Sequence, residues 1–159
     1  MLTDLTALIP PAWREIVDLD RLRKISKKIG SDFIPDPKLI FRSVECAPSD
    51  VKVVIVGQDP YPNPQHAMGL AFSVPAEIEV LPASLKNIYK ELKADLGVIR
   101  ENGDLSGWSE QGVLLLNMSL TVLPNQTGSH SKIGWQVITQ QIISDVARRG
   151  ALAVLWGRE

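Results

Sequence analysis

Three short runs of apolar residues divide the chain, and none of them alternates with polar residues as a half-exposed strand does. They are residues 51–57 (VKVVIVG), 112–117 (GVLLLN) and 151–156 (ALAVLW). Unbroken β-branched or leucine-rich runs of this length are typical of strands that are buried on both faces, as in a parallel sheet. The pattern therefore predicts three strands of one buried sheet.

Helical periodicity fills the intervals, with apolar residues every three or four positions over residues 13–29, 84–97 and 132–149. Ser84 is expected to cap the second of these helices and Gly97 to end it. A further helix is expected to begin at Asp36, an N-cap residue followed by Pro37. Strands separated by helices need right-handed crossovers, so we expect an α/β fold with three layers, α/β/α, around a central parallel sheet. The third strand is expected to leave one sheet edge unprotected.

Composition narrows the function classes. The 159 residues fit one domain, and 17 Lys and Arg against 18 Asp and Glu give a net charge of −1, so bulk charge offers no argument for nucleic-acid binding. One cysteine, Cys46, excludes an internal disulfide, and with two histidines it cannot supply a dedicated zinc site. The acidic N-terminal stretch and the lack of a long apolar segment favour a cytoplasmic protein.

Polar residues follow the end of every predicted strand. They are Gln58, Asp59 and Tyr61 after the first strand, Asn117 at the end of the second, and Gly157 and Arg158 after the third. Ligands of open parallel sheets bind at the carboxyl ends of the strands, so a carboxylate, a carboxamide and an aromatic ring are candidates to face one cleft. Taken singly, Asp59 before a proline and Asn117 at a strand end are more often turn or cap residues, and that interpretation stays open.

Other common chemistries lack their motifs. The sequence contains no GxGxxG after the first strand, no GxxxxGK[ST] and no GxSxG, which excludes the usual Gly-rich nucleotide loops and the serine nucleophile elbow. His66 and His130 have no identifiable partner and are expected to be surface residues or hydrogen-bonding loop anchors. Cys46 is expected to be a small core residue on a helix rather than a reactive thiol.

Five segments resemble successive blocks of the family 1 uracil-DNA glycosylases, in the GQDPYP variant found in actinobacterial-type sequences. They are GQDPYPNPQHAMGLAFSV (57–74), LPASLKNIYKEL (81–92), GWSEQGVLLLNMSLTV (107–122), HSKIGW (130–135) and VLWG (154–157). The combination of GQDPY, GLAFSV and GVLLLN at these spacings is highly specific. The resemblance implies a single domain over residues 1–159, with residues 1–50 as a helical lead-in.

The resemblance implies a DNA repair hydrolase that flips uracil out of DNA, cleaves its N-glycosidic bond and leaves an abasic site, without metal or organic cofactor. Asp59 would orient and deprotonate the attacking water and offset positive charge on the sugar. Phe72 would stack on the base, and Asn117 would recognise its polar edge. Tyr61 would exclude the thymine methyl group, and Gln58 would line the pocket largely through its backbone.

Phosphate contacts are implied for Pro82, Ser84 and Gly157, which would fix register without reading sequence. The implied partners are uracil-containing DNA, single- or double-stranded, and a protein inhibitor that mimics DNA. No membrane partner is implied, and the chain is expected to act as a monomer.

The sequence departs from the family pattern at three places, one of which is Arg158, which follows Gly157 where many members have serine. Pro62 stands where the commoner motif has histidine, and family members continue past VLWG to a further strand with a His-Pro-Ser-Pro-Leu-Ser motif and a closing helix, which the sequence given lacks. That motif carries a histidine that stabilises the departing uracil anion. Two hypotheses follow, an active glycosylase and a shortened, non-catalytic remnant that binds uracil or DNA. A third, weaker hypothesis is a flavodoxin-like protein that binds a small ligand.

Overall fold

The sheet consists of three parallel strands, as the apolar runs predict. The structure is a computed structural model that describes residues 3–156. Its strands are β1 (Val53–Gly57), β2 (Val113–Asn117) and β3 (Leu152–Leu155), in the order β2-β1-β3. The register pairs Gly57 with Asn117, so β1 and β2 end at the same level of the sheet.

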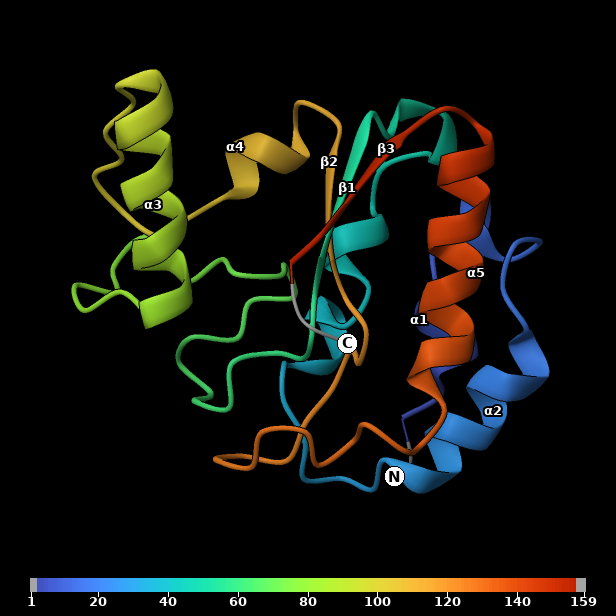
Figure 1. Cartoon of the computed structure of the whole chain (residues 1–159). Helices are drawn as coiled ribbons and strands as arrows, with labels where there is room; N and C mark the ends of the chain where they lie inside the picture. The colour runs from blue at the N-terminus through green and yellow to red at the C-terminus, as the bar shows by residue number, and fades with distance from the viewer. Residues whose placement is uncertain (1–2, 157–159) are drawn as a thin grey trace.

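Helices cover both faces of this sheet (Figure 1). On one side lie α1 (Leu5–Leu8), α2 (Leu19–Lys28) and α5 (Trp135–Arg148), and on the other lie α3 (Ala83–Leu96) and α4 (Ser106–Ser109). Side chains alternate between the faces of a strand, so Leu114 and Leu116 of β2 pack in the cluster that contains α1, α2 and α5, whereas Leu115 packs with α3. The three-layer α/β/α prediction is confirmed.

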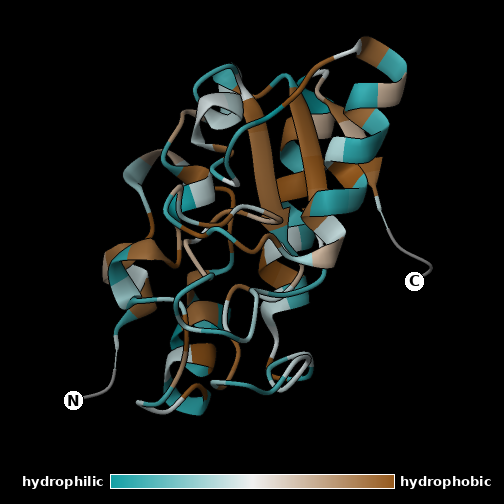
Figure 2. Cartoon of the chain, turned by 90° about the vertical axis from the view of Figure 1, so that its left-hand side faces the viewer, coloured by the Kyte–Doolittle hydropathy of each residue, from teal (hydrophilic) through white to brown (hydrophobic). Residues whose placement is uncertain are grey.

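Burial of the strands accounts for their unbroken apolar sequence. Leu114, Leu115 and Leu116 are all almost fully buried, and each such side chain contributes about 1.5–3 kcal/mol relative to an exposed one. Figure 2 shows the strands coloured as hydrophobic along their length. Both faces of β2 are covered, so a polar side chain on either face would lie in one of the two cores.

Two of the three periodic segments form helices close to their expected bounds, and the first is shorter. The α2 helix begins only after Asp18, whose carboxylate accepts a hydrogen bond of 2.8 Å from the Arg21 N–H. Trp13 instead belongs to a separate 3₁₀ turn (Pro11–Trp13). The α3 helix ends at Gly97, which has the left-handed φ of 68° expected of a helix C-cap, but its N-cap residue is Pro82 rather than Ser84.

The helix expected from Asp36 is absent from the described residues. The segment forms three 3₁₀ turns instead, Pro37–Leu39, Arg42–Val44 and Pro48–Asp50. Asp36 does cap the first turn, since its carboxylate accepts from the Lys38 N–H at 2.9 Å. Ile40, Phe41 and Val44 are buried in the core, but they are presented by separate short turns and not by one continuous helix. Cys46 therefore lies between turns and not on a helix, although it does pack against the core.

The β3 strand is exposed at the sheet edge, as the sequence predicts. Leu152 and Leu155 are 70% and 69% exposed, whereas Val154 packs against the cluster beside α3. The β2 edge is different because the Ala71 N–H donates to the Leu115 carbonyl at 3.0 Å and fastens a loop along it. None of the helices in residues 3–156 has the length and hydropathy needed to span a membrane.

Candidate active site

A cavity of about 240 Å³ lies at the carboxyl ends of β1 and β2. Six residues singled out from the sequence line it: Gln58, Asp59, Tyr61, Phe72, Ser84 and Asn117. The expectation that the strand ends and the loop around Phe72 would meet at one cleft is therefore met in geometry. Pro82 does not line this cavity, and Gly157 lies outside the described residues.

Backbone pairing between β1 and β2 continues past the strand ends and fixes the first part of the site. The Met118 N–H donates to the Gly57 carbonyl and the Ser119 N–H to the Gln58 carbonyl, both at 2.9 Å. Since the Gln58 carbonyl is already bonded, its backbone N–H is the main-chain group left to a ligand, and it has no acceptor among residues 3–156. The level at which Asp59 and Asn117 leave the sheet is thus set by sheet pairing.

Asn117 is 8% exposed and its carboxamide is hydrogen-bonded to none of the described residues, although it lines the cavity. Its polar atoms are open to the cavity, so the carboxamide is available to hydrogen-bond a polar ligand. Gly57 makes room for it, because a Cβ at Gly57 would lie 2.4 Å from Asn117 Oδ1. Sequence reasoning missed Gly57, whose pairing with Asn117 is visible only once the strand register is known.

Asp59 is held at one of its two oxygens. The Gly128 N–H donates to Asp59 Oδ2, while Oδ1 accepts from no residue that the structure describes. Partial burial raises the pKa of Asp59, and the bond from Gly128 opposes that rise. A carboxylate that is fixed, partly desolvated and free at one oxygen is suited to accept a proton from water.

The loop that carries Gly128 is itself anchored. The Asn125 N–H donates to the Pro62 carbonyl at 2.8 Å, and Ser129 Oγ accepts from the Leu123 N–H at 2.8 Å. Gly128 has a φ of 72°, a conformation that glycine adopts at low cost. The turn-rich sequence NQTGS (125–129) indicates a loop here, but no sequence signal assigns it to Asp59.

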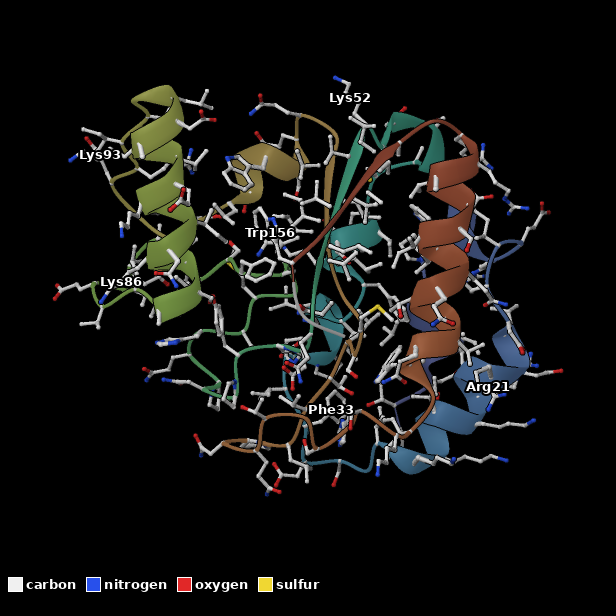
Figure 3. The ribbon with its side chains drawn as sticks, in the orientation of Figure 1. Arg21, Phe33, Lys52, Lys86, Lys93 and Trp156 are labelled. Carbon is white, nitrogen blue, oxygen red and sulfur yellow. The ribbon has the colours of Figure 1, made fainter. Side chains whose placement is uncertain are left out.

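Two aromatic side chains form other walls of the cavity. Phe72 has a φ of 65°, a left-handed conformation that costs a bulky residue about 1–3 kcal/mol and occurs mainly at functional sites. Its carbonyl accepts from the Tyr61 hydroxyl at 3.1 Å, and Tyr61 also bonds Ser84 Oγ at 2.8 Å. Figure 3 shows Trp156 where β3 ends, and its ring meets the Phe72 ring edge-on with centroids 5.4 Å apart.

The remaining candidates have structural roles. His130 is buried, and its Nδ1 bonds Thr121 Oγ1 at 2.8 Å, which confirms the loop-anchor interpretation; the Trp135 indole donates to the same oxygen at 2.8 Å. Burial lowers the pKa of His130. His66 is half-buried and lies edge-on to Tyr61. Within residues 3–156 no group of three or more His, Cys, Asp and Glu side chains could hold a metal ion.

The family described as the uracil DNA glycosylase superfamily matches residues 44–158. The chain belongs to this superfamily. The uracil-DNA glycosylase of Chromobacterium violaceum is 46% identical over 165 residues, which cover 95% of this chain and 69% of the relative. That of a Nocardioides species is 42% identical over 162 residues, covering 100% of this chain and 70% of the relative.

The crystal structure of mimivirus uracil-DNA glycosylase superposes with a TM-score of 0.85 at 29% identity, covering 98% of this chain and 63% of the mimivirus chain. The present chain thus spans less than two thirds of that solved glycosylase. Membership of the uracil-DNA glycosylase superfamily and the α/β glycosylase fold are confirmed, and this membership replaces the flavodoxin-like hypothesis. Assignment to family 1 and to its GQDPYP subgroup remains a prediction.

Proposed function

We propose that the chain hydrolyses the N-glycosidic bond between uracil and deoxyribose in DNA and leaves an abasic site. The observation that carries this proposal is the convergence of the Asp59 carboxylate, the Asn117 carboxamide and the Phe72 ring on one cavity, in a chain whose curated relatives are named uracil-DNA glycosylase. Those names disfavour the non-catalytic remnant.

The size of the cavity favours a single flipped base. Pockets for drug-sized ligands commonly have about 300–1,000 Å³, and this one has about 240 Å³. A base must leave the stack to enter such a cavity, which costs a few kcal/mol in duplex DNA and least in a single strand. Stacking on Phe72 would return about 1–3 kcal/mol of that cost.

Base selection follows from donor and acceptor patterns. Asn117 Oδ1 can accept from the uracil N3–H while its Nδ2 donates to the neighbouring carbonyl, O4. Cytosine has an acceptor at N3 and a donor at N4. In the same position its N3 would face the Asn117 acceptor Oδ1 and its amino group the donor Nδ2, so neither hydrogen bond could form. Tyr61, the aromatic wall of the cavity, would exclude the methyl group of thymine by its bulk.

Bond cleavage uses the free oxygen of Asp59. As the base leaves with the bonding electron pair, positive charge develops on the sugar and the nearby carboxylate offsets it. Water then attacks the sugar carbon from the face opposite the base, and Asp59 Oδ1 takes its proton. The described lining residues include no Lys, Arg or His, so only uncharged donors among them, such as the Asn117 amide and the Gln58 N–H, could stabilise the uracil anion.

The proposed partner is uracil-containing DNA, with Pro82, Ser84 and Gly157 as candidate phosphate contacts. Strand preference and the monomeric state remain predictions. A mimivirus UNG variant has been solved in complex with UGI, at 29% identity and a TM-score of 0.85 to this chain. By this likeness we propose that a protein inhibitor of the same kind blocks the cavity.

Uracil release from a single-stranded oligonucleotide with one deoxyuridine tests the proposal. We expect release by the chain and its suppression by UGI. Binding of the oligonucleotide with release no faster than that of Asp59→Asn would instead identify a non-catalytic remnant.

The activity should fall on the acid side at a higher pH than an ordinary aspartate would give. The raised pKa of Asp59 means that the carboxyl becomes protonated, and unable to accept a proton, at a pH above its usual value of about 3.9. The profile of kcat/KM against pH measures this limb. An unchanged acid limb in the residual activity of Asp59→Asn would assign it to another group.

Gly57→Ala is expected to lower kcat/KM on the order of 10²-fold, as displacement of a site group by about 1 Å can do. The new Cβ would lie 2.4 Å from Asn117 Oδ1 and would push the carboxamide from its position. Gly107→Ala is the matched control, because a Cβ there has no atom within 4 Å. Equal activity of the two variants would contradict the prediction.

A further inference from the structure

A chain of three oxygens connects α3 to the two aromatic walls of the cavity. Ser84 Oγ lies 2.8 Å from the Tyr61 hydroxyl, which lies 3.1 Å from the Phe72 carbonyl oxygen. A carbonyl only accepts, so the Tyr61 proton points to Phe72. The Ser84 hydroxyl must then donate to Tyr61, and its single hydrogen is fully used.

These hydrogen bonds give Ser84 a role that differs from the predicted helix cap and from a phosphate contact. Ser84 lies in the first turn of α3, whereas Tyr61 and Phe72 belong to the loops after β1 (Figure 1). The two hydrogen bonds therefore link α3 to loops that are far from it in sequence. It ends on the carbonyl of Phe72, the residue with a left-handed φ of 65°.

We propose that Ser84 is a positioning residue for base selection, which holds the Tyr61 ring against the C5 position of the base. This inference rests on the proposed function. Tyr61 is only half-buried, and without its bond to Ser84 the ring would be held by packing and by the Phe72 carbonyl alone. A Tyr61 ring that moves more easily would admit a larger substituent at C5 of the bound base.

A phosphate contact would reverse the direction of the chain without breaking it. If the Ser84 hydroxyl donates to a phosphate oxygen, its lone pair can accept from Tyr61, whose proton then leaves Phe72. Tyr61 stays tied to Ser84 in both states. The role of Ser84 in selection is thus separable from its proposed contact with DNA.

Binding of free bases separates the two roles, because free uracil and thymine carry no phosphate. We expect Ser84→Ala to raise the affinity for thymine relative to uracil about 2- to 12-fold, the effect of one hydrogen bond of about 0.5–1.5 kcal/mol. Tyr61→Phe, which keeps the ring but loses the hydroxyl, should give a similar ratio. The double variant should add little to either, since both remove the same bond.

Ligand-observed NMR titration of the full chain with each base measures the ratio, and thermal unfolding checks each variant. Ser84→Thr retains a hydroxyl and should keep the original ratio. Ser144→Ala is the matched serine control on α5, where the hydroxyl bonds to no described residue. A thymine-to-uracil ratio unchanged in Ser84→Ala, with weaker DNA binding, would reduce Ser84 to a phosphate contact. Failure of the unaltered chain to bind uracil would instead contradict the proposed function itself.

Discussion

Replacing Asp59 with Asn is expected to slow uracil release by about 10²–10⁴-fold, the usual contribution of a positioned general base. The amide has nearly the same shape, and its oxygen can still accept from the Gly128 N–H that holds Asp59 Oδ2. It cannot take a proton from water, and it carries no negative charge to offset the sugar cation. The loss should therefore appear in kcat, with binding of uracil-containing DNA little changed.

Single-turnover release and equilibrium DNA binding separate these two quantities. Stability is a useful control because the pKa of Asp59 is raised on folding. A raised carboxyl pKa means that the folded state disfavours the charged form at pH values above the unfolded pKa. The Asn variant should then unfold no more readily than the original at neutral pH. Release within a few-fold of the original rate would remove Asp59 from the reaction.

Asn117→Ala should lower kcat/KM for uracil about 10²–10³-fold, equivalent to about 3–4 kcal/mol, because two polar groups of a buried base lose their partners. Asn117 is only 8% exposed, so water cannot readily replace the carboxamide on the base edge. Rates on uracil-containing and cytosine-containing oligonucleotides measure the effect. A loss confined to protein stability would contradict a role in base recognition.

Asn117→Asp tests the donor and acceptor pattern at constant shape. A carboxylate only accepts, so it loses the bond to the uracil carbonyl but can accept from the amino group of cytosine. We expect uracil release to fall and the ratio of cytosine to uracil release to rise. Identical losses in the Ala and Asp variants, with no change in that ratio, would show that the side chain reads neither edge.

The sequence predicts the layers of this fold because they depend on patterns that are local along the chain. A run such as residues 112–117 can bury both faces only in a covered sheet, and Gly97 ends α3 as its type requires. The strand ends then point to Asp59 and Asn117 through topology alone. The strands, the helix end and the positions of the strand ends all depend on residues that are close together in sequence.

What sequence reasoning misses depends on contacts between distant segments. Gly128 reaches Asp59 across 69 positions, and Ser84 bonds Tyr61 across 23. The 3₁₀ turns after Asp36 are missed as well, because a good cap followed by residues that become buried does not here produce one continuous helix. Pattern thus identifies which residues face the cavity, and only the tertiary structure reveals which groups hold them in place.

The pairing of Gly57 with Asn117 has a consequence for how such a protein can change. Because side chains alternate along a strand, a one-residue deletion inside β1 or β2 would turn both the core leucines and the reactive groups to the wrong side at once. Substitutions can adjust the chemistry step by step, whereas insertions and deletions in these two strands are excluded. Variation in length is therefore expected only in the loops. The spacing of Asp59 and Asn117 is fixed by the pairing of β1 with β2 and should be kept wherever that pairing is kept.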